Sequence, residues 1–315
     1  MTQRAGHALV AALLAVLVAL LLSARTAAAA ERTLVQLAEE VSIGLLEEVN
    51  GLFARDWQER TGERVRFRLA VLPAQRQARA LAAGLTPDFA SARALTDAAS
   101  PAEAAVYATT IVFLARTARG REARDWGDLL APQVRVLAAD PRRSDVGRWS
   151  YLAAWSWALE AAGGDREAAL ARVRALYRKA ELLRSVTPAT ARDFLRRGRQ
   201  DVLLWYESEA HELAGRDSRA AVRTPPVSLR VETAPLVPAG DGDGDALRHA
   251  YLELLDGPLG REAAARHHFR GAAAAETAEL PALRLATVEE HLGGWQRVEE
   301  EHFAPGGLLE RVLAR

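Results

Sequence analysis

The sequence predicts an α/β fold built from two linked lobes. Strand-like and helix-like segments alternate along the chain, as they do in α/β proteins. Two proline-containing breaks, at 99–101 and 224–226, each precede a strand-like segment, and we expect the chain to cross between the lobes there. A length of 315 residues is enough for two ordinary domains with cores of their own.

The strands are predicted from short apolar runs bounded by polar or turn residues. These runs fit buried strands of a mostly parallel sheet, and they are Leu34–Leu37, Thr110–Leu114, Val134–Leu137 and Val202–Tyr206. Residues 65–71 alternate between apolar and polar side chains, which is the pattern of a half-buried strand. Residues 227–231 alternate in the same way and predict a further strand.

Helices are predicted between these strands. Apolar residues recur at helical spacing from Leu45 to Trp57, and Thr61-Gly62 ends that helix. A second helix carries Trp149, Leu152, Trp155 and Leu159 on one face and ends at Gly163-Gly164. A third is expected over 170–177, so two helices lie between the strands predicted at 134–137 and 202–206.

The first thirty residues have the order of a secretory signal peptide. Arg4 is followed by the apolar run Ala8–Leu22 and then by small residues up to Ala30. We expect cleavage after Ala30 and a periplasmic mature protein; the alternative is an uncleaved N-terminal anchor. The sequence contains no cysteine, which excludes an N-terminal lipid-modified cysteine, disulfides and thiolate metal sites.

Charge and motifs exclude several functions. With 41 basic and 41 acidic side chains the net charge is zero, which argues against a nucleic-acid partner. The sequence has no G-x-S-x-G elbow, P-loop or G-x-G-x-x-G motif. Glu207 and Glu209, two residues apart after a strand, are at best a weak acid/base pair. We predict no enzyme, no catalytic residue and no cofactor.

No metal site is predicted either. The segments 267–268, 289–291 and 299–302 contain histidine, but none has the spacing that places two imidazoles on one helical face. The alternating aspartates of 241–245 lack the rest of a calcium-binding loop. Solvated helix faces and a solvated loop account for these segments.

A series of short segments in the middle of the chain carries a resemblance to a known family. In order, it includes Thr109–Leu114, Asp125–Leu129, Gly147–Trp155, Asp201–Leu204, Glu207–Ala210 and, near the C-terminus, His302–Gly307. In this order and spacing the chain resembles the periplasmic sulfate/thiosulfate-binding proteins of ABC importers. The resemblance extends from about Leu34 to the C-terminus.

The resemblance implies a two-lobe periplasmic-binding-protein fold of type II. Each lobe is expected to hold a mostly parallel sheet flanked by helices, with a hinge between the lobes. Lobe 1 is expected at 31–108 and 227–270, lobe 2 at 109–226, and a helical tail that packs on the lobes at 271–315. One dehydrated oxyanion would lie between the lobes, held by N–H groups at helix N-termini, and a membrane permease would be the protein partner of this monomer.

The family's ligand positions fall on residues that differ from the family pattern. Its first Ser-Gly turn corresponds to Ala74 and the neighbouring Arg76, and its Ser-Gly-Gly loop corresponds to Ser144, Asp145 and Val146. The third loop corresponds to 186–189, which includes Thr187, and the tryptophan donor corresponds to Tyr206. The opening Asp-Pro-Thr-Arg segment is replaced by Glu40–Ile43.

Part of the binding chemistry is retained. Ser144 and Tyr206 offer hydroxyl donors, and Thr187 before Pro188 predicts the start of a helix that can face the cleft. Asp145 is the departure with the largest consequence, because a carboxylate beside the ligand would repel sulfate. It could instead accept a proton from a protonated anion, or point away from the cleft at the start of its helix.

Three functions are therefore open from the sequence. The first is a solute-binding protein for sulfate, thiosulfate or a close oxyanion. The second is the same fold with changed specificity, for a protonated oxyanion or small organic acid selected by Arg76, Tyr206 and Asp145. The third is a descendant that does not transport and serves as a sensory or interaction module.

Overall fold

The computed structural model describes residues 31–72, 74–91, 107–117, 123–197, 199–233, 236–238, 246–271, 280, 283 and 285–314. The predicted signal peptide at 1–30, the break at 99–101 and the aspartate-rich loop at 241–245 lie outside these residues. Within the described part, no helix is both long and apolar enough to cross a membrane.

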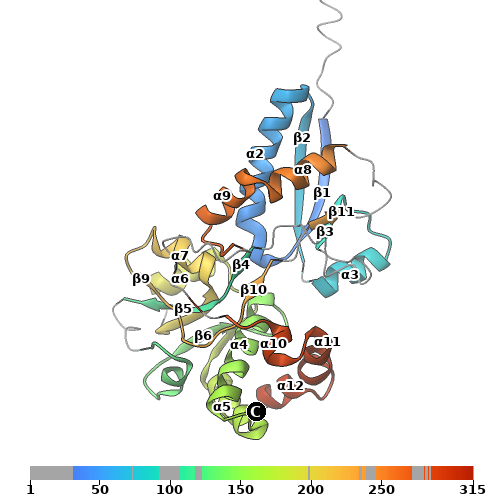
Figure 1. The fold of residues 1–315 in the computed structure, drawn as a ribbon. Helices are drawn as coiled ribbons and strands as arrows, with labels where there is room; N and C mark the ends of the chain where they lie inside the picture. Colours follow the sequence, from blue (N-terminus) through green and yellow to red (C-terminus); the bar gives the residue numbers. More distant parts are fainter. Residues whose placement is uncertain are drawn as a thin grey trace, which may run out of the picture.

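Lobe 1 is built around a four-stranded sheet (Figure 1). Its order is β11 (Leu236–Pro238), β3 (Phe89–Ser91), β1 (Glu31–Ala38) and β2 (Arg64–Val71). Strand β1 runs parallel to both β2 and β3, and β11 pairs antiparallel with β3. The predicted strands at 34–37 and 65–71 are thus confirmed as neighbours in this sheet.

The core of lobe 1 lies between this sheet and the helices α2 (Ile43–Thr61) and α8 (Ala246–Asp256). The ring of Phe53 packs edge-on against Phe67 and Tyr251, at centroid distances of 6.0 and 5.3 Å. Helix α2 ends where the sequence predicts, at Gly62, whose φ of 76° is in the left-handed region that favours glycine. Two further helices, α3 (Ala74–Ala82) and α9 (Pro258–Arg266), complete the lobe.

Lobe 2 is built around a five-stranded sheet. Its order is β7 (Glu181–Leu183), β6 (Val136–Ala139), β8 (Val202–Tyr206), β5 (Ile111–Arg116) and β9 (Ala220–Arg223). Strand β6 is parallel to β7 and β8, whereas β5 is antiparallel to β8 and β9. Every residue of β6 and β8 is buried, which explains why both appear in the sequence as unbroken apolar runs. The α/β class is confirmed.

The central helix of lobe 2 is α4 (Asp145–Ala161), accompanied by α5 (Arg166–Lys179), α6 (Pro188–Arg197) and α7 (Glu207–Ala214). The C-terminal helices α10 (Val288–Leu292), α11 (Trp295–Val298) and α12 (Leu308–Leu313), with the π-helical turn η4 (Glu299–Phe303), lie beside α4 and α5 (Figure 1). Trp149 packs edge-on against Trp295 at 5.1 Å. Helix α4 is therefore buried well beyond the single apolar face that its sequence pattern predicts.

The lobes are joined by a two-stranded antiparallel ribbon of β4 (Ala108–Thr109) and β10 (Val231–Glu232), which runs between them in Figure 1. The predicted strand at 227–231 is wrong as a continuous element, because Leu229 forms only an isolated bridge with Ala286. Ala108 also bridges to Arg270. The chain thus passes between the lobes a third time after α9, before it reaches the C-terminal helices on lobe 2.

Candidate functional site

The first turn of α4 brings together Ser144, Asp145 and Val146, as the sequence predicts. Ser144 is the N-cap, with extended backbone, and its Oγ accepts a hydrogen bond from the Gly147 N–H at 3.4 Å. Asp145 is the first helical residue, and Val146 is completely buried. The serine, and not the aspartate, therefore caps this helix.

Gly147 fixes the position of this helix end. A Cβ at Gly147 would lie 2.8 Å from both the carbonyl carbon and the carbonyl oxygen of Asp140. The first turn of α4 thus rests directly on the backbone that follows β6. Only glycine permits this approach without a shift of the helix.

Glu40 of lobe 1 reaches this helix end. It lies in the short 3₁₀ turn η1 (Glu40–Ser42) that follows β1. Its carboxylate accepts hydrogen bonds from Ser144 Oγ, at 3.3 Å, and from the backbone N–H of Val146. The N-terminal end of a 17-residue helix carries partial positive charge and favours an anion there. A carboxylate of the protein itself thus occupies the position where a bound anion is expected.

Burial dominates the electrostatics of Glu40. It raises the pKa of this carboxyl above its usual value, while the hydrogen bonds from Ser144 and Val146 act in the opposite direction. The sequence had marked Glu40 only as part of a replaced segment. A signal for Glu40 was present in the sequence. This glutamate stands at the first position of the replaced segment, where the family pattern has an aspartate.

A cleft of about 310 Å³ opens between the lobes, and neither Glu40 nor the residues 144–146 are among those that line it. Lobe 1 contributes the start of α2, and lobe 2 contributes α6, the end of β8 and α7. The lining residues are Ile43, Gly44, Glu47, Pro188, Arg192, Trp205, Glu209, Glu212, Leu213, Arg216 and Asp217. Burial, together with the charges of Glu212, Glu40 and Glu47, raises the pKa of Glu209 to about 7. The charge of Glu40 thus acts on a carboxyl group that lines the cleft.

Two other predicted residues border this region. Helix α6 begins at Pro188, and the Thr190 N–H donates to Thr187 Oγ1 at 3.3 Å, so the predicted N-cap is confirmed. Thr187 itself is exposed, and Pro188 lines the cleft. Tyr206 is the last residue of β8, pairs with Ile111 and is buried. Its neighbour Trp205, which the sequence did not single out as a ligand residue, lines the cleft instead.

Ala74 and Arg76 do not join this group. Both lie at the start of α3, which stands beside β3 and β11 on the opposite side of the molecule from α6 and α7 (Figure 1). Arg76 is exposed. The neighbouring Gln77 is the buried residue here: it donates to the Leu72 carbonyl at 2.8 Å and accepts from the Ser91 N–H at 3.0 Å. Gln77 thus joins the start of α3 to β3 of lobe 1, and the role of Ala74 and Arg76 as ligand residues stays a prediction.

The acidic and histidine side chains for which the sequence predicts no functional role have structural partners. Glu207 is completely buried and paired with Arg270, which accounts for one member of the weak acid/base pair. His267 lies between Glu48, at 2.9 Å, and Glu212, at 3.6 Å, and so joins α9 to both lobes. Among the described residues, no group of three or more histidine, aspartate or glutamate side chains could hold a metal ion.

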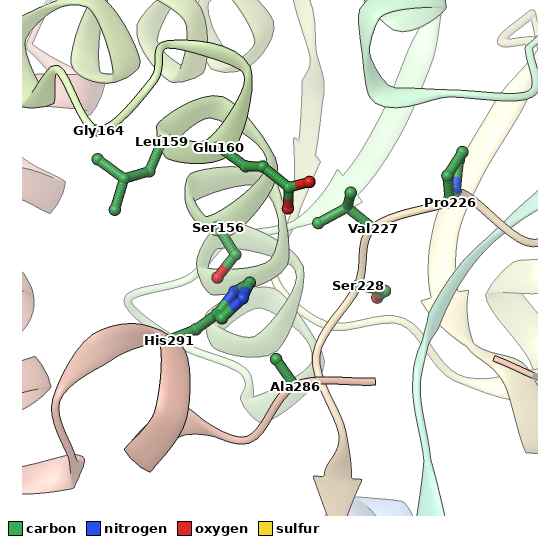
Figure 2. Close-up of a pocket in the computed structure, with 9 residues that line it drawn as sticks. All are labelled: Ser156, Leu159, Glu160, Gly164, Pro226, Val227, Ser228, Ala286 and His291. Atoms are coloured by element: carbon green, nitrogen blue, oxygen red, sulfur yellow. The ribbon is translucent and has the colours of Figure 1, made fainter. Parts of the chain in front are cut away.

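A second pocket, of about 480 Å³, lies elsewhere on lobe 2. Figure 2 shows it between the C-terminal half of α4, the segment 226–228 and the start of the C-terminal helices. The Ser156 side chain points toward His291 in this view, and Glu160 borders the opposite side. None of the predicted ligand residues lines this pocket.

Comparison with known proteins identifies the family of this chain. Residues 43–270 match the family described as bacterial extracellular solute-binding protein. The chain belongs to this family. Among its relatives, the sulfate-binding protein of Escherichia coli is 33% identical over 323 residues, covering 94% of this chain and 97% of the relative. The thiosulfate-binding protein of Pseudomonas aeruginosa is 27% identical, covering 91% and 94%.

Solved structures show the same fold. The sulfate-binding protein from Mycobacterium tuberculosis superimposes with a TM-score of 0.71 at 24% identity, over 86% of this chain and 98% of that one. A periplasmic thiamin-binding protein superimposes with a TM-score of 0.63 at 15% identity, over 90% and 96%. The bacterial extracellular solute-binding proteins are therefore the family of this chain in both sequence and fold, and their function is solute binding rather than catalysis.

Proposed function

We propose that this member of the family is a periplasmic solute-binding protein that delivers a small oxyanion, sulfate or a close relative, to the permease of an ABC importer. The proposal includes export by the signal peptide at 1–30, cleavage after Ala30, and action as a monomer. It keeps the division into lobes at 31–108 with 227–270 and at 109–226, with the tail at 271–315.

The contact between Glu40 and the first turn of α4 carries this proposal. The Ser144 hydroxyl and the Val146 N–H are neutral donors at a helix N-terminus, and both donate to a carboxylate oxygen. Sulfate at neutral pH, like a carboxylate, accepts hydrogen bonds and donates none. Donors that hold a carboxylate therefore also suit sulfate.

The position of Asp145 also supports an oxyanion. Burial lowers the pKa of Arg148, one turn further along α4, and the charges of Glu299 and Asp145 act against this shift. Arg148 lies over the ring of Phe303, 3.6 Å from its centroid, on the side of the C-terminal helices. Arg148 thus provides the Asp145 charge with a cationic partner within the protein, which favours the alternative in which this carboxylate points away from a ligand.

The names of the relatives support the same ligand class. The Escherichia coli and Pseudomonas aeruginosa relatives are named for sulfate and thiosulfate, respectively. A second candidate is a small organic acid, and a specific observation favours it: the group that the α4 donors hold here is a carboxylate.

Calorimetric titration of the purified protein tests the proposal. Sulfate, thiosulfate, phosphate, molybdate and small carboxylates are added in turn, and we expect sulfate or thiosulfate to bind with a sub-millimolar Kd. Binding of a small carboxylate alone would select the second candidate. If no anion bound or shifted the Tm, oxyanion transport would be contradicted in favour of a sensory or interaction module.

A matched pair of variants tests the site itself. Ser144→Ala removes one hydroxyl donor and should make the free energy of anion binding less favourable by about 1–3 kcal/mol. Ser156→Ala removes a buried hydroxyl from the same helix but beside the second pocket, and should leave the Kd unchanged. Equal effects of the two substitutions would place the anion elsewhere.

A further inference from the structure

We infer that Glu40 is a tethered competitor: its carboxylate occupies the α4 donors in the ligand-free protein, and an incoming oxyanion has to displace it. This inference rests on the proposed function. It assigns to Glu40 the role of a residue that sets the affinity of the site and holds the two lobes together before a solute arrives.

The first argument is that Glu40 engages the donors that the solute requires. Its carboxylate receives both the Ser144 hydroxyl, at 3.3 Å, and the Val146 N–H. An anion at the same helix end needs the same two donors. Since one N–H cannot make a full hydrogen bond to two anions at once, Glu40 and the solute exclude each other.

The second argument is that the backbone of Glu40 is fixed to lobe 1. The preceding residue, Glu39, is buried, and its carboxylate accepts a hydrogen bond from Ser91 Oγ at 2.7 Å. The Glu39 carbonyl accepts from the Ser42 N–H at 3.2 Å and from Ser42 Oγ at 3.0 Å. The turn that carries Glu40 is thus fixed to lobe 1, and the Glu40 side chain extends from it to Ser144 of lobe 2.

The tether determines how strongly Glu40 competes. A group joined to its site by a short chain acts at an effective concentration in the millimolar range or above. Competition from the tethered carboxylate raises the apparent Kd of a free oxyanion. Removal of the carboxylate should therefore lower this Kd at least about tenfold. Loss of the contact should also let the ligand-free lobes separate, because Glu40 bridges them.

The charge that surrounds the cleft does not explain such an effect by itself. Glu47 lines the cleft on the first turns of α2, where it is exposed on the wall opposite α6 and α7. Glu47→Gln therefore removes one cleft charge and leaves the α4 donors as they are. It is the matched control for Glu40→Gln, which removes the same charge from the donors themselves.

The experiment titrates sulfate into the wild type, Glu40→Gln, Glu40→Ala and Glu47→Gln at pH 7.5, with the Tm of each variant as a check of folding. We expect both Glu40 variants to bind sulfate at least about tenfold more tightly than the wild type, and Glu47→Gln, which removes only a solvent-screened cleft charge, to gain clearly less affinity than either. Small-angle X-ray scattering of the ligand-free proteins should show a larger radius of gyration for the Glu40 variants only.

The outcomes separate this inference from the proposed function. If the wild type binds sulfate and the Glu40 variants bind it equally or more weakly, the tethered competitor is wrong and the proposed function stands. If Glu47→Gln gains as much affinity as Glu40→Gln, general charge and not displacement sets the Kd. If neither the wild type nor a Glu40 variant binds any anion of the panel, both proposals are wrong.

Discussion

Arg270 and Glu207 form a two-point ion pair that ties the segment after α9 to the first residue of α7. Nε of Arg270 lies 2.7 Å from Oε2 of Glu207, and Nη2 lies 2.8 Å from Oε1. Glu207 is completely buried, and Arg270 also exchanges two backbone hydrogen bonds with Ala108 of β4. The pair therefore anchors the connection between the lobes to lobe 2.

This pair should be essential for stability. Arg270→Met leaves the Glu207 carboxylate buried without its cation, and we expect the free energy of unfolding to fall by about 3–5 kcal/mol. Arg297→Met, which breaks the exposed pair with Glu301 on the C-terminal helices, should cost less than about 1 kcal/mol. Urea unfolding of both variants checks the difference. Similar losses would mean that the buried pair contributes no more than a surface one.

The close approach at Gly147 predicts an effect on both folding and binding. Gly147→Ala places a methyl group 2.8 Å from backbone atoms of Asp140, so α4 must shift, at about 1–3 kcal/mol. Because the shift moves the Ser144 and Val146 donors, anion affinity should fall as well. Gly51→Ala in α2, whose nearest atom would lie at 3.8 Å, should stabilise the protein by about 0.5–1 kcal/mol. An unchanged Tm and Kd for Gly147→Ala would remove this constraint on the site.

His302 predicts a loss of stability at acidic pH. Burial lowers the pKa of His302 to about 4, and its Nδ1 lies 2.8 Å from the Tyr151 hydroxyl. Below pH 6.5 the unfolded chain binds a proton at this histidine while the folded protein does not. The free energy of unfolding should thus fall by about 1.4 kcal/mol per pH unit from 6.5 toward 4. Urea titrations of His302→Gln should lack this part of the slope, and an identical slope in both proteins would contradict the assignment.

Glu209 predicts a change of opposite sign over an overlapping range. In the folded protein its pKa is raised to about 7, so the carboxyl keeps its proton where the unfolded chain, with a usual value near 4.5, has released it. This contribution to stability is present below pH 4.5 and is lost as the pH rises through 7. Relative to the wild type, Glu209→Gln should therefore gain stability between pH 5 and 7.5. A constant difference across that range would show that Glu209 does not titrate there.

Ionisation of Glu209 should also change the affinity for the ligand. Glu209 shares the cleft with Glu212, Asp217 and Glu47 on the acidic side and with Arg192 and Arg216 on the basic side. Above pH 7 its charge adds to the repulsion of an incoming anion, so sulfate affinity should fall between pH 6 and 8. In Glu209→Gln this fall should be reduced, as measured by calorimetry at both pH values.

The fold was predictable because buried strands leave a strong local pattern. The apolar runs predict β1, β5, β6 and β8 to within about three residues of their observed bounds. The alternation at 227–231 predicted a continuous strand that is absent, because its apolar residues make separate contacts with different segments. Leu229 bridges to Ala286, and only Val231 enters a ribbon with β4. Period-two alternation records burial of alternate side chains and does not require a continuous ladder.

The site was predictable only in part. Ser144, Asp145 and Val146 are adjacent in sequence, so their grouping at one helix end follows from local signals. The contact of Ser144 with Glu40 joins residues 104 positions apart and depends on how the lobes meet, which no local pattern encodes. Ala74 and Arg76, which correspond to the family's first loop, lie at the start of α3, and their role as ligand residues stays a prediction.

The anion-binding role of the α4 N-terminus is tested most directly by a crystal structure of the protein with the tightest-binding anion of the calorimetric panel. We expect an anion that accepts hydrogen bonds from Ser144 Oγ and the Val146 N–H, with the Glu40 carboxylate displaced from both. An anion bound elsewhere, with Glu40 still on these donors, would contradict it.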